Sequence, residues 1–197
     1  MPARIRCFSS CLLLAAVLAG CDADDPQMER RAAVAHAPPA RGRVLGGERV
    51  DRRVQWPRQI DADALAALPS GSRAALATAP APVLVPPAAH GLAGGTLITG
   101  ESWWAYTASS QGMTVAIQAS TRARLYPHVR AFVPHDTVRG LPGFVQQVHR
   151  IWTLSWIEND TAYSLELECA SAELPPCQSD AAARSLADAL VNVGGAG

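Results

Sequence analysis

The chain has 197 residues, in which 17 Lys+Arg balance 17 Asp+Glu to give a formal charge of zero. Because nucleic-acid binding needs a concentrated positive field, this balance gives no reason to expect nucleic acid as a partner. The length allows one domain of ordinary size plus tails.

The first residues have the layout of a secretory signal. Arg4 and Arg6 make a short basic start, and residues 7–18 are apolar apart from two serines. This apolar stretch is too short for a membrane-spanning helix, which needs about 20 such residues. A buried N-terminal helix is the alternative, but the charge placement and the polar run that follows argue against it. We therefore expect residues 1–20 to be a signal peptide.

The end of this segment is more specific. Leu18-Ala19-Gly20-Cys21 resembles the lipobox of bacterial lipoprotein precursors. The resemblance implies cleavage before Cys21, attachment of diacylglycerol to its sulfur and acylation of the freed amine. Two or three acyl chains hold a protein on a bilayer far more firmly than one. Asp22 resembles the signal that retains such proteins in the inner membrane, which implies a location on its periplasmic side. The alternative is an accidental cysteine after an ordinary secretory signal.

The cysteine count agrees with this interpretation. Of five cysteines, cleavage would remove Cys7 and Cys11, and lipid would take Cys21. The remaining two, Cys169 and Cys177, would lie in an oxidising compartment and are expected to form a disulfide. Closing this short loop would contribute about 2–3 kcal/mol if the geometry is unstrained. The alternatives are two free thiols or a metal pair, but no ligand histidine lies nearby to complete a zinc site.

Residues 21–55 read as a disordered tether, because they are rich in Asp, Ala, Arg, Pro and Gly and lack sustained periodicity. The second half of the tether is basic and could rest on anionic lipid, although a solvated linker is the simpler interpretation. We expect one folded domain over residues 56–197.

Two short helices are expected at the start of this domain. Asp61 is a suitable N-cap for a helix stopped by Pro69, and Ser70 or Ser72 could cap a second one that ends at Pro80. Residues 83–85 would then be a short extended segment between prolines, which keeps the segment at an edge.

Strand patterns dominate from Thr96 onward. Residues 102–108 and 113–119 flank a turn and predict a hairpin. Val129, Ala131 and Val133 continue the alternation, and residues 140–143 read as a loop.

The strongest local signal is a second hairpin, formed by residues 151–157 and 161–169. A two-residue turn at Asn159-Asp160 pairs Trp156 with Tyr163 and Ser155 with Ser164, and a four-residue loop would give the same pairing. One face then carries six large apolar side chains and the other is mostly polar, as a half-buried antiparallel sheet requires.

The last predicted element is a helix that Ser179 or Asp180 would cap and that ends at Gly194-Gly195. Its apolar stripe would pack on the apolar face of the second hairpin. The predicted fold class is therefore α+β: an antiparallel β-sheet of about five or six strands, with short N-terminal helices and one C-terminal helix packed on one face. The stripe consists of Ala183, Leu186, Ala187, Leu190 and Val191.

Residues 152–195 are similar to a family of uncharacterised proteobacterial lipoproteins. The similarity lies in Ser155-Trp156, in the run from Tyr163 to Cys169 and in the closing residues 190–195. It implies no known activity. More distantly, strands followed by one terminal helix resemble periplasmic α+β domains of the lipoprotein and anti-sigma-factor type.

Residues suited to catalysis or metal binding do not form a convincing set. His128, His135 and Asp136 could build a metal site, but no helical ligand pair supports one, and exposed loop histidines are the simpler interpretation. Glu166 and Glu168 share one face of a strand that carries nothing else reactive. We expect no cofactor and no metal.

The aromatic strand is the better candidate for a binding surface. Trp103, Trp104 and Tyr106 form the candidate ligand or partner face, for a glycan, a peptide or a lipid. Adjacent residues of a strand point to opposite faces, so one tryptophan would fill the core and the other would face outward. The alternative is that residues 80–95 cover the outward tryptophan.

These observations favour a lipid-anchored periplasmic protein that acts as a non-enzymatic binding or accessory module in the envelope. Its expected partners are the membrane, through the N-terminal lipid, and an envelope protein. One alternative is an envelope enzyme with a site dispersed in sequence, and another is a structural or sensory partner of a membrane complex. An exposed apolar groove containing Trp103 or Trp104 would favour binding, whereas a deep polar pocket with converging histidines and carboxylates would favour the enzyme.

Overall fold

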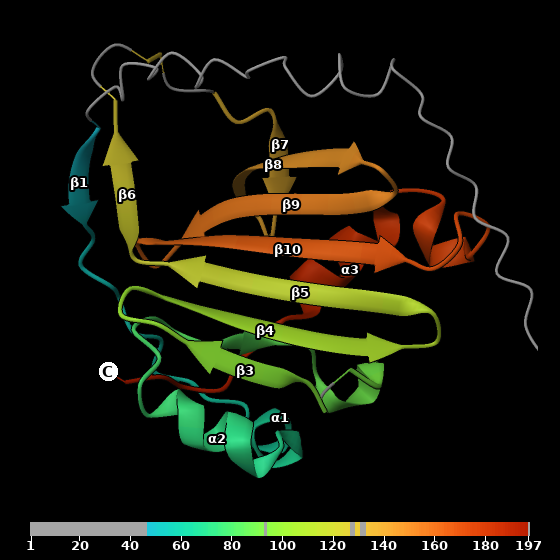
Figure 1. Cartoon of the computed structure of the whole chain (residues 1–197), viewed down its shortest axis with the longest axis horizontal. Helices are drawn as coiled ribbons and strands as arrows, with labels where there is room; N and C mark the ends of the chain where they lie inside the picture. Colours follow the sequence, from blue (N-terminus) through green and yellow to red (C-terminus); the bar gives the residue numbers. More distant parts are fainter. Residues whose placement is uncertain (1–46, 93, 127–128, 131–132, 197) are drawn as a thin grey trace, which may run out of the picture. The chain divides into compact units, whose positions relative to one another are not determined.

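Figure 1 shows the arrangement of the elements in the computed structural model, which describes residues 47–92, 94–126, 129–130 and 133–196. The predicted signal peptide, the lipobox-like segment and most of the predicted tether lie outside these residues. Within the described part of the chain, no helix is long and apolar enough to cross a membrane.

The main sheet has seven antiparallel strands in the order β3-β4-β5-β10-β9-β8-β7 (Figure 1). Strands β3–β5 form one meander and β7–β10 form another, and the pairing of β5 with β10 joins the two. The strands are β3 (Thr96–Thr99), β4 (Trp103–Ser110), β5 (Met113–Ser120), β7 (Asp136–Val138), β8 (Leu141–Val148), β9 (Ile151–Glu158) and β10 (Thr161–Cys169).

Two short ribbons accompany the main sheet. In one, β1 (Glu48–Asp51) pairs with β6 (Arg122–Leu125), and in the other, β2 (Leu84–Val85) pairs with β11 (Val191–Asn192). Strand β1 lies inside the range 21–55 predicted as a tether, so the predicted boundary of the folded domain is too late. The composition of this segment did not indicate a strand, because β1 depends on a partner more than 70 positions away.

The helices are short: α1 (Ala62–Ala67), α2 (Ser70–Leu76) and α3 (Ala181–Ala189), with 3₁₀ turns η1 (Ala88–His90) and η2 (Pro175–Cys177). Asp61 caps α1 as predicted, because its side-chain oxygen accepts from the Ala64 N–H at 2.8 Å. No side-chain hydrogen bond caps the N-terminus of α2 or of α3.

The α+β class is confirmed, but the predicted strand count and helix placement are wrong. The described residues form eleven strands in three sheets. Helix α2 lies along the edge strand β3, where Ser72 Oγ accepts from the Leu97 N–H at 3.0 Å. Helix α3 packs on β9 and β10 but stops at Ala189, so the last two residues of the predicted stripe fall outside it.

Strand β8 was missed because Pro142-Gly143 reads as a turn. In the structure Pro142 pairs with Thr137 of β7, where the missing N–H of a proline is tolerated near a sheet edge. A β-carbon on Gly143 would lie 2.7 Å from the Ser155 carbonyl oxygen, so close strand packing requires glycine here. Conversely, the predicted strand around Val129 and Val133 is wrong: both lie outside strands and are exposed, and Ala131 is outside the described residues.

The second hairpin has the predicted register throughout. Trp156 faces Tyr163, and Ser155 faces Ser164. Asn159 and Asp160 both have positive φ, 54° and 58°, as a two-residue turn of type I′ requires.

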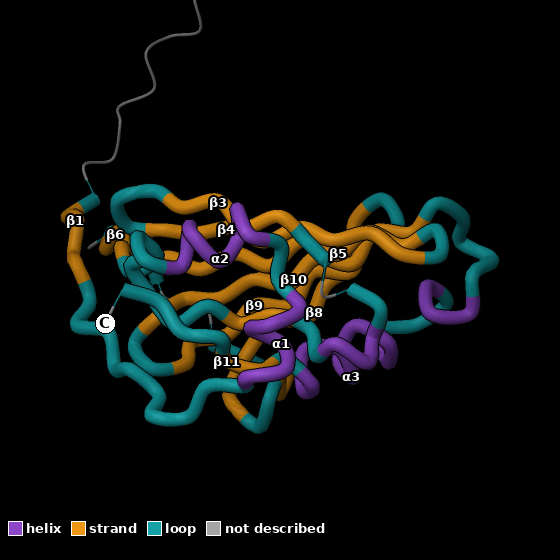
Figure 2. The backbone as a smooth tube through the Cα atoms, turned by 90° about the horizontal axis from the view of Figure 1, so that it is seen from below, coloured by secondary structure: helices purple, strands orange, loops and turns teal. Residues whose placement is uncertain are grey.

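One face of the main sheet is covered. Figure 2 shows α1, α3 and β11 on the same side of the strands. On this side Tyr163 stacks on Trp156 with ring centroids 5.4 Å apart, and its hydroxyl donates to the Pro82 carbonyl at 3.0 Å. The largest fully buried side chains include Trp104, Tyr106, Ile117, Leu154, Leu165 and Leu167.

Two connections fix α3 to the sheet. The Cys169–Cys177 disulfide is present and joins the end of β10 to η2, just before the helix. At the other end of α3, the Arg139 guanidinium donates to the Leu190 carbonyl at 3.1 Å and pairs with Glu158 at 2.9 Å. The β7–β8 turn therefore holds the C-terminus of the helix.

Candidate open-face binding groove

The second face of the main sheet is exposed, and we call it the open face. Because strand residues alternate between faces, each large apolar residue buried beneath the sheet has neighbours that point outward. Among the outward-pointing residues, Ile98, Trp103 and Ile157 are 53%, 43% and 49% exposed. Apolar side chains thus remain accessible to solvent on this face.

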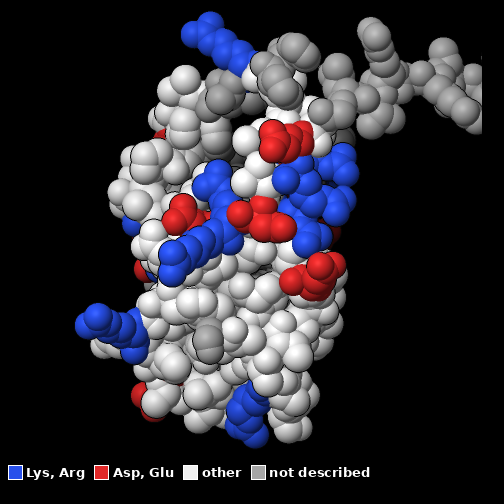
Figure 3. All heavy atoms as spheres, turned by 90° about the vertical axis from the view of Figure 1, so that its left-hand side faces the viewer, with Lys and Arg blue, Asp and Glu red and all other residues white. Residues whose placement is uncertain are grey.

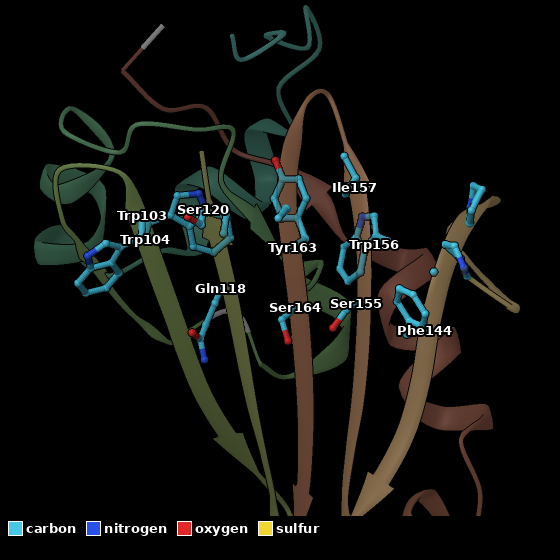
Figure 4. A pocket seen from close by; sticks show the side chains of 15 residues that line it. Trp103, Trp104, Gln118, Ser120, Phe144, Ser155, Trp156, Ile157, Tyr163 and Ser164 are labelled. Atoms are coloured by element: carbon cyan, nitrogen blue, oxygen red, sulfur yellow. The ribbon is translucent and has the colours of Figure 1, made fainter. Parts of the chain in front are cut away.

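A groove of about 610 Å³ lies on the open face, and we call it the open-face groove (Figure 4). It crosses β4, β5, β10, β9 and β8, and the connection before β7 borders it. Its volume is in the range of small-molecule sites. The side chains of the open face that line it belong to Trp103, Gln118, Ser120, Pro142, Phe144, Ser155, Ile157, Ala162 and Ser164, together with Pro134 of the connection.

The strand register arranges these side chains in two parallel rows. In the first row Trp103, Ser120, Ala162 and Ile157 are neighbours on β4, β5, β10 and β9. This row is apolar apart from one hydroxyl. In the second row Gln118, Ser164, Ser155 and Phe144 are neighbours on β5, β10, β9 and β8. This row carries neutral polar groups and ends on an aromatic ring.

The Trp103 ring is held in place by a glycine. A β-carbon on Gly100 would fall 2.3 Å from Trp103 Nε1 and 2.5 Å from its Cε2, so the indole lies directly against the Gly100 backbone. The Gly100 N–H also donates to the Trp103 carbonyl at 2.8 Å. Trp103 can therefore stay half-exposed at the end of the first row without a covering segment.

The open-face groove offers no acid–base chemistry in the described part of the chain. Its described lining residues include no Asp, Glu, Lys, Arg or His. Tyr163 also borders the groove, but its side chain is buried on the covered face. Burial raises the pKa of the Tyr163 phenol, and the negative charge of Glu158 raises it further. The groove is thus suited to binding an uncharged molecule.

Charged side chains gather instead at the end of the molecule beside β1 and β6, where acidic and basic residues are interleaved (Figure 3). Arg122 pairs with Asp51 at 2.7 Å and with Glu101 at 3.2 Å. The hydrogen bonds that the Arg122 guanidinium donates to these two carboxylates raise the pKa of Arg122. Arg52 approaches Asp160 at 3.8 Å.

Of the three aromatic residues predicted to form a ligand or partner face, the structure places only Trp103 on the open face. Trp104 and Tyr106 are fully buried on the covered face, so assigning them to the same surface was wrong. Trp104 packs edge-to-face on Tyr163, and the Tyr106 hydroxyl donates to the Leu92 carbonyl and accepts from the Gly95 N–H. Burial raises the pKa of Tyr106. Residues two apart on a strand share a face, which puts Trp104 and Tyr106 together beneath the sheet.

Most of the groove was missed by sequence reasoning. Ser155 and Ser164 were placed correctly on the polar face of the second hairpin, but nothing in the sequence indicated that Gln118 lies beside them. That proximity depends on the pairing of β5 with β10, whose residues are more than 40 positions apart. Phe144 belongs to the strand that was not predicted.

The remaining candidate residues either do not line the groove or lie outside the described part of the chain. Cys21 and His128 lie outside the described residues, and His135 approaches Asp136 at 3.3 Å. Glu166 and Glu168 point to the open face but do not line the groove. Within the described part of the chain, no cluster of three His, Cys, Asp or Glu side chains could hold a metal ion.

Comparisons of this chain with protein-family models, with curated proteins and with solved structures gave no match.

Proposed function

We propose that this chain is a lipid-anchored periplasmic protein of the bacterial envelope that acts as a non-enzymatic binding module through its open face. The observation that supports a binding role is the open-face groove, which contains the half-exposed Trp103 and is lined by uncharged described residues. A solvent-accessible apolar groove with a few polar groups is the usual form of a binding site. The lipobox-like segment supports the anchored location.

The binding role can be tested by site-specific photocrosslinking in intact cells. A benzophenone amino acid replaces Gln118, which lines the groove, or Thr107, which is exposed on the same face of the sheet but outside the groove. Ultraviolet light should then give a discrete adduct from position 118 and none from position 107. Equal labelling at both positions, or labelling at neither, would contradict a binding role for the groove.

A further inference from the structure

We propose that the open-face groove binds a single extended acyl chain of a membrane lipid, laid across the strands between Trp103 and Phe144. This inference rests on the proposed function and specifies its ligand.

The length of the groove fits such a chain. Trp103 is on β4 and Phe144 is on β8, and the order β4-β5-β10-β9-β8 places four strand-to-strand steps between them. At roughly 4.8 Å per step, the groove is about 19 Å long. The hydrocarbon core of a bilayer is about 30 Å thick and holds two acyl chains end to end, so one chain needs about 15 Å. One extended chain therefore fits across the sheet.

The surface chemistry of the groove fits an apolar chain with a small uncharged polar group. The first row offers exposed apolar carbon from Trp103 and Ile157, and its central Ala162 is small enough to leave room for a ligand. In the second row the hydroxyls of Ser155 and Ser164 provide neutral hydrogen-bonding groups that an ester could use. None of the described lining residues is charged, so none would need a charged group of the ligand as its partner.

The sheet topology argues against an extended peptide. Strands β5, β10 and β9, which form the floor of the groove, each have a hydrogen-bonded strand on both sides. Their main-chain groups are therefore already paired, and a peptide lying across them would find no ladder partner for its own N–H and C=O groups. A glycan would bring many hydroxyls to the open face of the groove, where the described side chains offer three serine hydroxyls, one amide and the indole N–H of Trp103.

The test uses the mature chain reconstituted into phosphatidylcholine vesicles that contain phosphatidylcholine with a diazirine in one acyl chain. After irradiation and proteolysis, mass spectrometry locates the label. We expect label on the strands that line the groove, at peptides containing Trp103, Ala162 or Phe144. Label confined to the segment before residue 47 would overturn the proposal, because the probe would then report only the bilayer around the anchor.

A matched pair of variants makes the test specific. Ala162 and Thr107 are both exposed on the open face, but only Ala162 lines the groove. Ala162→Glu should reduce labelling of the groove by at least about tenfold, because an apolar chain could bind there only by displacing the water that hydrates the carboxylate. Thr107→Glu should leave the labelling unchanged. Equal effects of the two variants, with both proteins folded by circular dichroism, would overturn the proposal.

The outcomes separate this inference from the proposed function. If position 118 gives an adduct in cells while no lipid label reaches the groove, the binding role stands and the acyl chain is the wrong ligand. If the adduct at position 118 is a soluble glycan or peptide, the binding role likewise stands and the acyl chain is the wrong ligand. The protein's own lipid could also occupy the groove. In that case the groove would be labelled only when the acyl chains on Cys21 carry the diazirine, and this result would also overturn the proposal.

Discussion

At the scale of single residues, the site depends on the contact between Trp103 and Gly100. The indole rests on the glycine backbone, and this contact sets one end of the groove. An aromatic ring binds more tightly where its orientation is fixed before the ligand arrives, because less conformational entropy is then lost on binding. The proposed function therefore requires that residue 100 carry no side chain.

Gly100→Ala tests this requirement. The new β-carbon would collide with the Trp103 ring, so the ring must move off the backbone, and crosslinking from position 118 should fall. Because Gly100 does not have a positive φ, the backbone itself accepts alanine, and the free energy of unfolding should change by less than about 1 kcal/mol. Near-ultraviolet circular dichroism and the crosslinking yield report the two effects.

Gly71→Ala is the matched control. A β-carbon there meets nothing within 4 Å, and Gly71 lies in α2, where alanine should stabilise by up to about 1 kcal/mol. If the two alanine variants give the same spectrum and the same crosslinking yield, Trp103 is not positioned by Gly100.

At the scale of elements, Asp136 connects β7, β8 and α3. Its carboxylate accepts from Arg184 at 2.8 Å and from the Val145 N–H at 3.1 Å, and His135 approaches it at 3.3 Å. The hydrogen bond from Arg184 is the main reason that the pKa of Asp136 is lowered, and the Val145 N–H and the charges of His135 and Arg184 lower it further.

The lowered pKa of Asp136 predicts a pH dependence of stability. A carboxylate with a lower pKa in the folded state stabilises fully above its unfolded pKa of 3.8, and this contribution is lost as the pH falls through the folded value. The stability difference between the wild type and Asp136→Asn should thus shrink as the pH is lowered from about 5 to 2. Urea unfolding at successive pH values measures it.

Glu168→Gln serves as the control, because Glu168 is exposed and forms no hydrogen bond or ion pair through its side chain with the described residues. Its difference from the wild type should stay small at every pH. A constant difference for Asp136→Asn as well would show that the carboxylate does not contribute through its charge.

Two neighbouring hairpins show what sequence reasoning could and could not predict. The β9–β10 hairpin was predicted with its register, because Asn159-Asp160 is a recognisable turn and the flanking residues alternate. The β8–β9 hairpin turns at His149-Arg150, which have φ of 49° and 68°, and neither residue type indicates such a turn. Local signals thus predicted one hairpin, whereas its neighbour and most of the groove depend on long-range pairing.

At the scale of the whole molecule, the sheet has two different roles on its two faces. The covered face holds the core, the disulfide-linked helix α3 and the β2–β11 ribbon. The open face is therefore available for binding. In the proposed function, a tether of residues before β1 would keep this open face close to a bilayer that supplies its ligand.

The proposed function depends on attachment of the chain to that bilayer, and the intact mass of the protein purified from envelopes shows whether the chain is acylated. We expect a chain that begins at Cys21 and carries a diacylglycerol on the sulfur and an acyl group on the amine. We also expect Cys21→Ser to leave an uncleaved precursor without acyl label. A native mass that still includes residues 1–20, or a chain beginning at Cys21 without fatty acid, would contradict the proposed attachment.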